Sequence, residues 1–194
     1  MKSKEESVMG LFYEYPAKHW HFEDILIEAK TSRSKAAAWL KKFAREKMVK
    51  RVKEKGKMPY YVADYESFSY QNKKKIFALK EMEKSGFLSH LASQESTVII
   101  FGSMARWDWH KKSDIDIFVY GKNNIDKISY ERKLNREMQI FSASNEKDLK
   151  KMGEGLIKNI LKGYLIKGDL DFIKIRTKVS GMPRRRVLSS AGRD

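Results

Sequence analysis

A hydrophobic run, a Gly-Ser pair and an Asp-Ile-Asp step ten residues later constrain this chain more than any other feature. The run covers residues 97–101 and predicts a buried strand, and a second predicted strand covers residues 115–120. Gly102 and Ser103 follow the first strand, while Asp114 and Asp116 stand at the start of the second. Because side chains alternate along a strand, both carboxylates are expected on one face.

Two carboxylates that converge outside a core are costly unless a cation lies between them. Mg²⁺ prefers one or two carboxylates together with phosphate oxygens, so we expect Asp114 and Asp116 to bind Mg²⁺, with Mn²⁺ as an alternative. The Gly-Ser turn is expected to open a short helix over residues 104–107. Its free N–H groups and the Ser103 hydroxyl would face a phosphate, which predicts a nucleoside triphosphate site.

This arrangement resembles the minimal nucleotidyltransferases of the DNA polymerase β-like superfamily. The family signature of Gly-Ser, ten residues and Asp-x-Asp is met without a gap, and the matching residues are Gly102, Ser103, Ala105, Arg106, Ser113, Asp114 and Asp116. The resemblance implies an α+β domain with a mixed sheet over residues 93–175. It also implies transfer of a nucleoside monophosphate, AMP first, to a hydroxyl of an acceptor. The residues it implies for nucleotide binding are Gly102, Ser103, Arg106 and Ser113; a surface ion pair of Arg106 with Asp108 is the alternative.

The chain departs from the family pattern at two places. The family's third carboxylate, on a later strand, is replaced by Gln139. We expect Glu137 to serve as the third catalytic carboxylate if the strand register shifts, with Asp169 and Asp171 as more remote alternatives. A glycine of the family is replaced by Trp107, whose ring is expected to narrow the nucleotide approach or to pack below it.

The positive charge of the chain is concentrated in two segments. The formal net charge is +16, and residues 30–57 carry twelve Lys or Arg against two Glu. Proteins this basic attract polyanions, although a highly charged thermophilic surface is the alternative. Residues 174–194 are also basic, and residues 176–194 are expected to be a disordered tail.

The basic segment lies in an N-terminal unit, residues 1–66, that we expect to be a winged helix-turn-helix. Periodicity predicts helices over 5–13, 22–29 and 35–47, and β-rich composition predicts strands over 49–52 and 60–63 around a basic turn. In that fold the third helix enters the major groove and the wing contacts phosphates. The candidate DNA-binding residues are Lys35, Lys41, Lys42, Arg45, Lys53, Lys55 and Lys57. Docking of a protein is the alternative use of this unit.

The remaining segments complete the expected architecture. A connecting helix is expected within residues 67–92, over 70–91, with a break near Gly86. Beyond the Asp-x-Asp strand we expect a helix over 125–136, a strand over 137–141, a helix over 145–162 and strand ends over 164–166 and 170–175. The chain has no cysteine, no long apolar stretch and no N-terminal signal pattern, so we expect a cytoplasmic protein without a membrane partner.

Two functions stay open from the sequence. The first is a Mg²⁺-dependent nucleotidyltransferase that uses a nucleoside triphosphate, ATP first, and an unknown acceptor, with the winged helix binding nucleic acid or a protein partner. The second is a regulator that binds duplex DNA and keeps a degenerate nucleotidyltransferase domain for nucleotide binding alone, or inactive. The acceptor of the first could be a protein, a small molecule or a nucleic acid.

Overall fold

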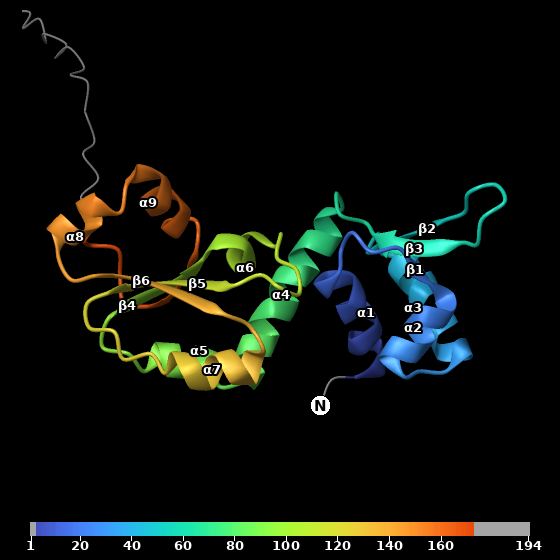
Figure 1. The fold of residues 1–194 in the computed structure, drawn as a ribbon, viewed down its shortest axis with the longest axis horizontal. Coiled ribbons are helices and arrows are strands. Elements are labelled where there is room, and N and C mark those ends of the chain that lie inside the picture. Colours follow the sequence, from blue (N-terminus) through green and yellow to red (C-terminus); the bar gives the residue numbers. More distant parts are fainter. Residues whose placement is uncertain (1–2, 173–194) are drawn as a thin grey trace, which may run out of the picture.

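The N-terminal part of the protein consists of three helices and a small antiparallel sheet. The computed structural model describes residues 3–172 (Figure 1). The elements of this part are α1 (Lys4–Glu14), β1 (Trp20–His21), α2 (Phe22–Ala29), α3 (Arg33–Arg45), β2 (Val49–Val52) and β3 (Tyr60–Ala63). The strand order is β1-β3-β2, and the β2–β3 hairpin projects away from the rest of the molecule (Figure 1). The three helices and two longer strands predicted from the sequence are confirmed, with α3 shifted two residues toward the N-terminus.

A long helix joins this part to the second sheet. α4 (Phe68–Lys84) is capped at its N-terminus by Ser67, whose side chain accepts a hydrogen bond from the Tyr70 N–H. α5 (Phe87–Ala92) follows α4. The break between them falls at Gly86, whose φ of +80° is accessible to glycine at little cost. The single helix expected over 70–91 is therefore two helices, interrupted where the glycine suggested.

The second part is built around a mixed four-stranded sheet. Its elements are β4 (Thr97–Phe101), α6 (Gly102–Arg106), β5 (Ile115–Tyr120), α7 (Lys127–Leu134), β6 (Met138–Ala143), α8 (Glu146–Lys151), α9 (Glu154–Ile160) and β7 (Tyr164–Lys167). The strand order is β6-β5-β4-β7, in which β5 and β6 are parallel and the other pairs antiparallel. The predicted mixed sheet is confirmed.

Two predictions for the C-terminal segments were wrong. The helix expected over 145–162 is interrupted between α8 and α9, because Gly153 takes a φ of +75° that a helix cannot contain. Residues 170–172 of the expected last strand form a turn, in which the Asp169 carboxylate accepts the Asp171 N–H at 3.1 Å. Residues 173–175 of that strand, and the tail over 176–194, lie outside the described residues.

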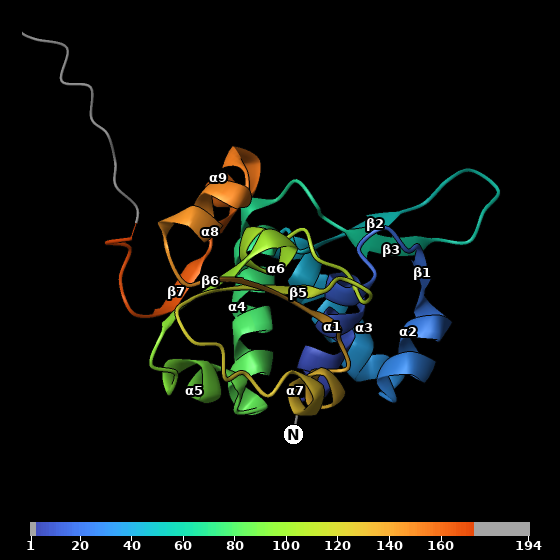
Figure 2. The ribbon, with the colours of Figure 1, turned by 60° about the vertical axis from the view of Figure 1, so that its left-hand side comes forward.

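The two faces of the mixed sheet have different partners. One face, with Ile115 and Ile117, belongs to a core that continues through α4 and α5 into α1 and α2 of the N-terminal part. In Figure 2, α5 and α7 lie on one side of the mixed sheet and α8 and α9 on the other. The other face, with Phe101 and Phe118, packs under α8 and α9. Because one core runs through both parts, α4 is a packed element rather than a free linker. The domain boundaries at residues 66 and 92 stay predictions.

Candidate nucleotide and metal site

Asp114 and Asp116 lie at the beginning of β5, on the face of the sheet opposite Ile115 and Ile117. The two isoleucines are fully buried in the larger core, whereas both aspartates are only partly buried. Asp116 is paired in register with Phe101 of β4 on one side and with residue 139 of β6 on the other. β5 and the residue before it thus carry two carboxylates at one end of the sheet face that α8 and α9 cover further along.

Gly102 presses its backbone directly against the Asp116 carboxylate. It has a φ of +71°, and a Cβ built on it would lie 1.9 Å from Asp116 Oδ2. No side chain fits there while Asp116 keeps its position, and only glycine adopts this backbone conformation without strain. The structure therefore explains why Gly-Ser precedes Asp-x-Asp: the first turn of α6 and the carboxylate share one small space.

Gln139 takes the position beside Asp116 where the family pattern expects a third carboxylate. Its Nε2 donates a hydrogen bond of 2.6 Å to Asp114 Oδ2. Within residues 3–172, no three His, Cys, Asp or Glu side chains gather in a group able to hold a metal ion. Glu137, Asp169 and Asp171 therefore do not complete a three-carboxylate site in the described part of the chain, although Glu137, directly before β6, lines the same hollow as Asp114.

The charges at this end of β5 suit a divalent cation. Burial raises the pKa of Asp116, the negative charge of Asp114 raises it further, and Arg106 opposes both effects. A cation between the carboxylates would relieve this repulsion. The donors are hard oxygens, so they fit Mg²⁺ or Mn²⁺ in the mode that leaves coordination positions for water and phosphate.

Two of the predicted nucleotide-binding residues, Arg106 and Ser113, already have hydrogen-bond partners within the protein. Arg106 donates to the Asp108 carboxylate at 3.3 Å and 3.4 Å, which is the ion pair considered as the alternative, and to the Asn159 side chain of α9 at 2.9 Å. The Ser113 hydroxyl accepts the His110 N–H at 2.9 Å and closes the loop before Asp114. These contacts give Arg106 and Ser113 structural partners in addition to any role toward a nucleotide.

Ser103 lies in the first turn of α6, and Trp107 follows the last residue of this short helix. α6 begins at Gly102, two residues earlier than expected, and Ser103 is partly exposed in its first turn. Trp107 ends the helix with a φ of +90°, a conformation that favours the glycine of the family pattern. Its ring packs edge-on against Tyr65, with centroids 4.7 Å apart, so it ties the loop after α6 to the segment between β3 and α4.

The seven predicted DNA-binding residues lie on α3 and on the β2–β3 hairpin. All seven are exposed. Lys42 donates to Glu5 at 2.7 Å and Lys57 to Glu54, so these two carry local counter-charges. The remaining five, which no ion pair within residues 3–172 neutralises, are Lys35, Lys41, Arg45, Lys53 and Lys55.

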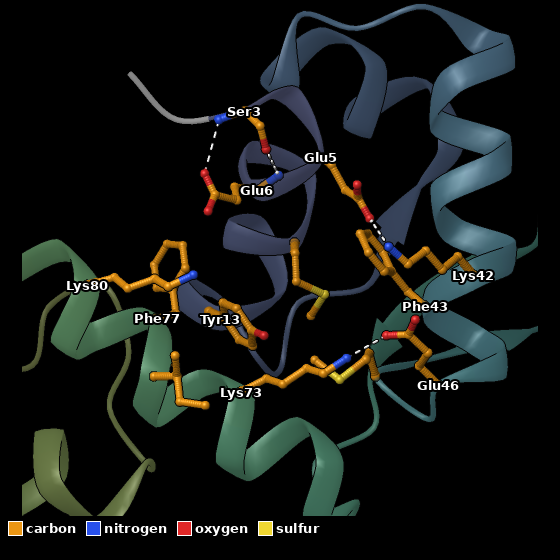
Figure 3. Close-up of a pocket in the computed structure, with 13 residues that line it drawn as sticks. Ser3, Glu5, Glu6, Tyr13, Lys42, Phe43, Glu46, Lys73, Phe77 and Lys80 are labelled. Carbon is orange, nitrogen blue, oxygen red and sulfur yellow. Dashed lines mark hydrogen bonds and ion pairs between the residues drawn. The ribbon is translucent and has the colours of Figure 1, made fainter.

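A hollow of about 490 Å³ separates α3 from α1 and α4 (Figure 3). Its lining includes Met9 and Phe43, and the Lys42–Glu5 and Lys73–Glu46 ion pairs stand at its edge. Sequence reasoning did not anticipate it, because its residues come from three helices and form no motif. Because Lys42 lines this hollow and pairs with Glu5, its side chain lies on the side of α3 that faces α1 and α4.

A second hollow, of about 710 Å³, opens beside Asp114. It is bounded by the loop before β5 and by the turn between α7 and β6, and it contains Glu137 and Arg136 as well as the exposed Lys112 and Arg132. Glu137 thus shares a surface with Asp114 without entering a metal cluster. Arg136 was missed by sequence reasoning, since an arginine between a helix and a strand carries no signal of its own.

The comparison with known families covers the second part of the chain. Residues 88–174 match the family model described as polymerase beta, nucleotidyltransferase. This match supports a polymerase β-like domain over these residues. The match begins within α5 and includes the Gly-Ser turn, both aspartates and Gln139, so the polymerase β-like region contains the whole candidate site. Neither the curated proteins nor the solved structures contain a significant match to the chain.

Proposed function

We propose that the protein is a divalent-metal-dependent nucleotidyltransferase that moves a nucleoside monophosphate, AMP first, from a triphosphate to an acceptor hydroxyl. One observation carries this proposal: Asp116 packs against the glycine that opens α6, with Asp114 two residues before it, within a region that matches the nucleotidyltransferase family. The bare Gly102 backbone permits close approach at that point, as phosphate-binding turns require.

Each residue has a defined task in the proposed reaction. The acceptor oxygen forms a bond to the α-phosphorus, the bond to the bridging oxygen breaks, and pyrophosphate leaves. A bound Mg²⁺ or Mn²⁺ would stabilise the charge on the phosphate oxygens and lower the pKa of the acceptor hydroxyl. Asp114 and Asp116 would hold the metal, Ser103 would bind a phosphate, and Glu137 is the candidate that accepts the acceptor proton.

Gln139 supports a second candidate function. An amide brings no negative charge to the catalytic metal, and its donor group is already used on Asp114. Such a site would bind a metal–nucleotide complex but transfer the nucleoside monophosphate slowly or not at all. The protein would then be a DNA-binding regulator that senses a nucleotide.

Labelled nucleotide separates the two functions. With α-labelled ATP and Mg²⁺ in a cell lysate, the transferase is expected to place label on an acceptor, and Asp114→Asn is expected to remove it, because the metal loses a charged ligand. Nucleotide binding without any transferred label would favour the regulator. Gln139→Asp serves as the opposite variant: if the amide limits catalysis, the added carboxylate should increase labelling.

We further propose that the N-terminal part is a winged helix that binds duplex DNA. The order α1, β1, α2, α3 and a hairpin agrees with that fold, and α3 and the hairpin carry the unneutralised basic residues. In such a complex α3 would enter the major groove and the hairpin would contact phosphates.

Charge reversal on α3 tests this DNA-binding surface. Lys41→Glu combined with Arg45→Glu is expected to weaken binding to duplex DNA by about tenfold to a thousandfold and to lower the salt slope by about two. Fluorescence anisotropy at several salt concentrations measures both. The control, Lys147→Glu with Lys150→Glu in the exposed α8, makes the same charge change at a place remote from α3 (Figure 1). Equal losses in both variants, or none in either, would contradict a specific role of α3.

A further inference from the structure

We propose that Arg136 is a positioning residue that holds the loop delivering Asp114 to the metal site. The inference rests on the proposed function and adds a residue to it. Arg136 Nη1 lies 2.7 Å from the His110 carbonyl oxygen, 3.2 Å from that of Lys111 and 2.9 Å from that of Ser113. One guanidinium nitrogen thus lies within hydrogen-bonding distance of three carbonyl oxygens of the loop that ends at Asp114.

The same guanidinium also covers the buried ring of this loop. Its central carbon lies 5.0 Å from the ring centroid of Trp109, which is only 1% exposed. On α4, Phe77 stacks on Trp109 with the centroids 6.2 Å apart and the planes 13° apart. Arg136 is therefore bound to the loop through its ring as well as through its carbonyls, and α4 supports the ring.

Asp114 needs such support more than Asp116 does. Asp116 is within β5 and has strand partners on both sides, whereas Asp114 precedes the strand. The next residue, Ile115, donates its N–H to the Glu137 carbonyl at 2.9 Å, and Gln139 holds the Asp114 carboxylate. The main chain and the side chain at residue 114 are both set by the short segment 136–139.

Removing the guanidinium should therefore weaken the metal site by releasing Asp114. Three loop carbonyls would lose a charged donor, which is among the stronger hydrogen-bond types in proteins. Loss of groups that orient a metal ligand typically lowers metal affinity by about tenfold to a hundredfold. Arg136→Lys is expected to fall between wild type and Arg136→Ala, since an ammonium group cannot reproduce the planar fork.

The experiment measures Mn²⁺ affinity by electron paramagnetic resonance on the full chain without nucleotide. Arg136→Ala is expected to bind Mn²⁺ about tenfold to a hundredfold more weakly, and millimolar guanidinium, but not ammonium, is expected to restore part of the affinity. The matched control is Arg132→Ala, which removes an exposed guanidinium from the same hollow and should leave the affinity unchanged.

Hydrogen exchange of the loop distinguishes failure of this inference from failure of the proposed function. Amides of residues 110–114 should exchange faster in Arg136→Ala than in Arg132→Ala, whether or not metal binds. If wild type binds no Mn²⁺, the proposed function and the metal role of Arg136 are overturned together. If wild type binds and folded Arg136→Ala binds equally well, or its loss is not restored by guanidinium, the positioning role alone is overturned. Should Arg136→Ala fail to fold, Arg136→Lys decides by the same two measurements.

Discussion

Gly102→Ala is expected to abolish metal-dependent nucleotide binding while leaving most of the fold intact. The new Cβ would lie 1.9 Å from Oδ2 and 2.8 Å from Cγ of Asp116, so the carboxylate has to turn away. Disturbing the orientation of a metal ligand typically lowers metal affinity by about tenfold to a hundredfold. Calorimetric titration with Mg²⁺ and ATP should therefore show a loss of at least that order.

A second glycine separates the effect of the clash from the effect of the backbone. Gly153 has a φ of +75°, close to that of Gly102, but a Cβ at Gly153 would meet nothing within 4 Å. Both alanine variants should lose about 1 to 3 kcal/mol of stability from the positive φ, since Gly153, with a ψ of 152°, also occupies a region that side chains rarely adopt. Only Gly102→Ala should lose nucleotide binding, and unchanged binding in this variant would show that Asp116 is not part of the site.

Lys74→Met is expected to stabilise the protein by about 1 to 4 kcal/mol at neutral pH, the range found when buried ion pairs are replaced by apolar residues of similar volume. Lys74 is fully buried on α4, and its Nζ has no hydrogen-bond partner within residues 3–172. The ammonium group lies 4.6 Å from the ring centroid of Trp109 and 5.6 Å from that of Tyr70. A methionine would keep the ring contacts without a buried charge.

The pH dependence of this gain follows from the titration of Lys74. Burial lowers the pKa of Lys74 to about 7, although Asp108 favours the charged form. Between pH 7 and the ordinary lysine value of 10.5 the unfolded chain holds a proton that the folded chain has released, so wild-type stability rises with pH. The advantage of Lys74→Met should be full below pH 7 and fade toward pH 10.5 in denaturant unfolding. Lys80→Met, on the exposed side of α4, should show no such trend, and a pH-independent gain at Lys74 would contradict this explanation.

Local patterns were sufficient to predict most elements and the centre of the candidate site. The apolar face of α2, and the β-rich composition of β2 and β3 on either side of a basic turn, placed these three elements at their observed bounds. The shared face of Asp114 and Asp116 followed from strand geometry alone. The break at Gly153 was missed, because a glycine can stand in a helix and only its tertiary surroundings select a positive φ. The turn over residues 170–172 was missed as well.

The contacts that position the site could not be predicted in the same way. Arg136 and Ser113 are separated by 23 residues in sequence, and Lys42 and Glu5 by 37. Such pairs arise only when separate elements pack, and no periodicity or spacing reports them. The hydrogen bond of Gln139 to Asp114 likewise depends on the parallel register of β5 and β6, which sets residue 139 beside residue 116.

Calorimetric titration of ATP into wild type and Asp114→Asn, each with and without Mg²⁺ or Mn²⁺, tests the central claim most directly. We expect one binding event in wild type that requires the metal and is lost in Asp114→Asn, whose amide can still accept the hydrogen bond from Gln139 but carries no charge. Absence of heat from wild type with either metal and each common nucleoside triphosphate would contradict the account, as would equal binding by the variant.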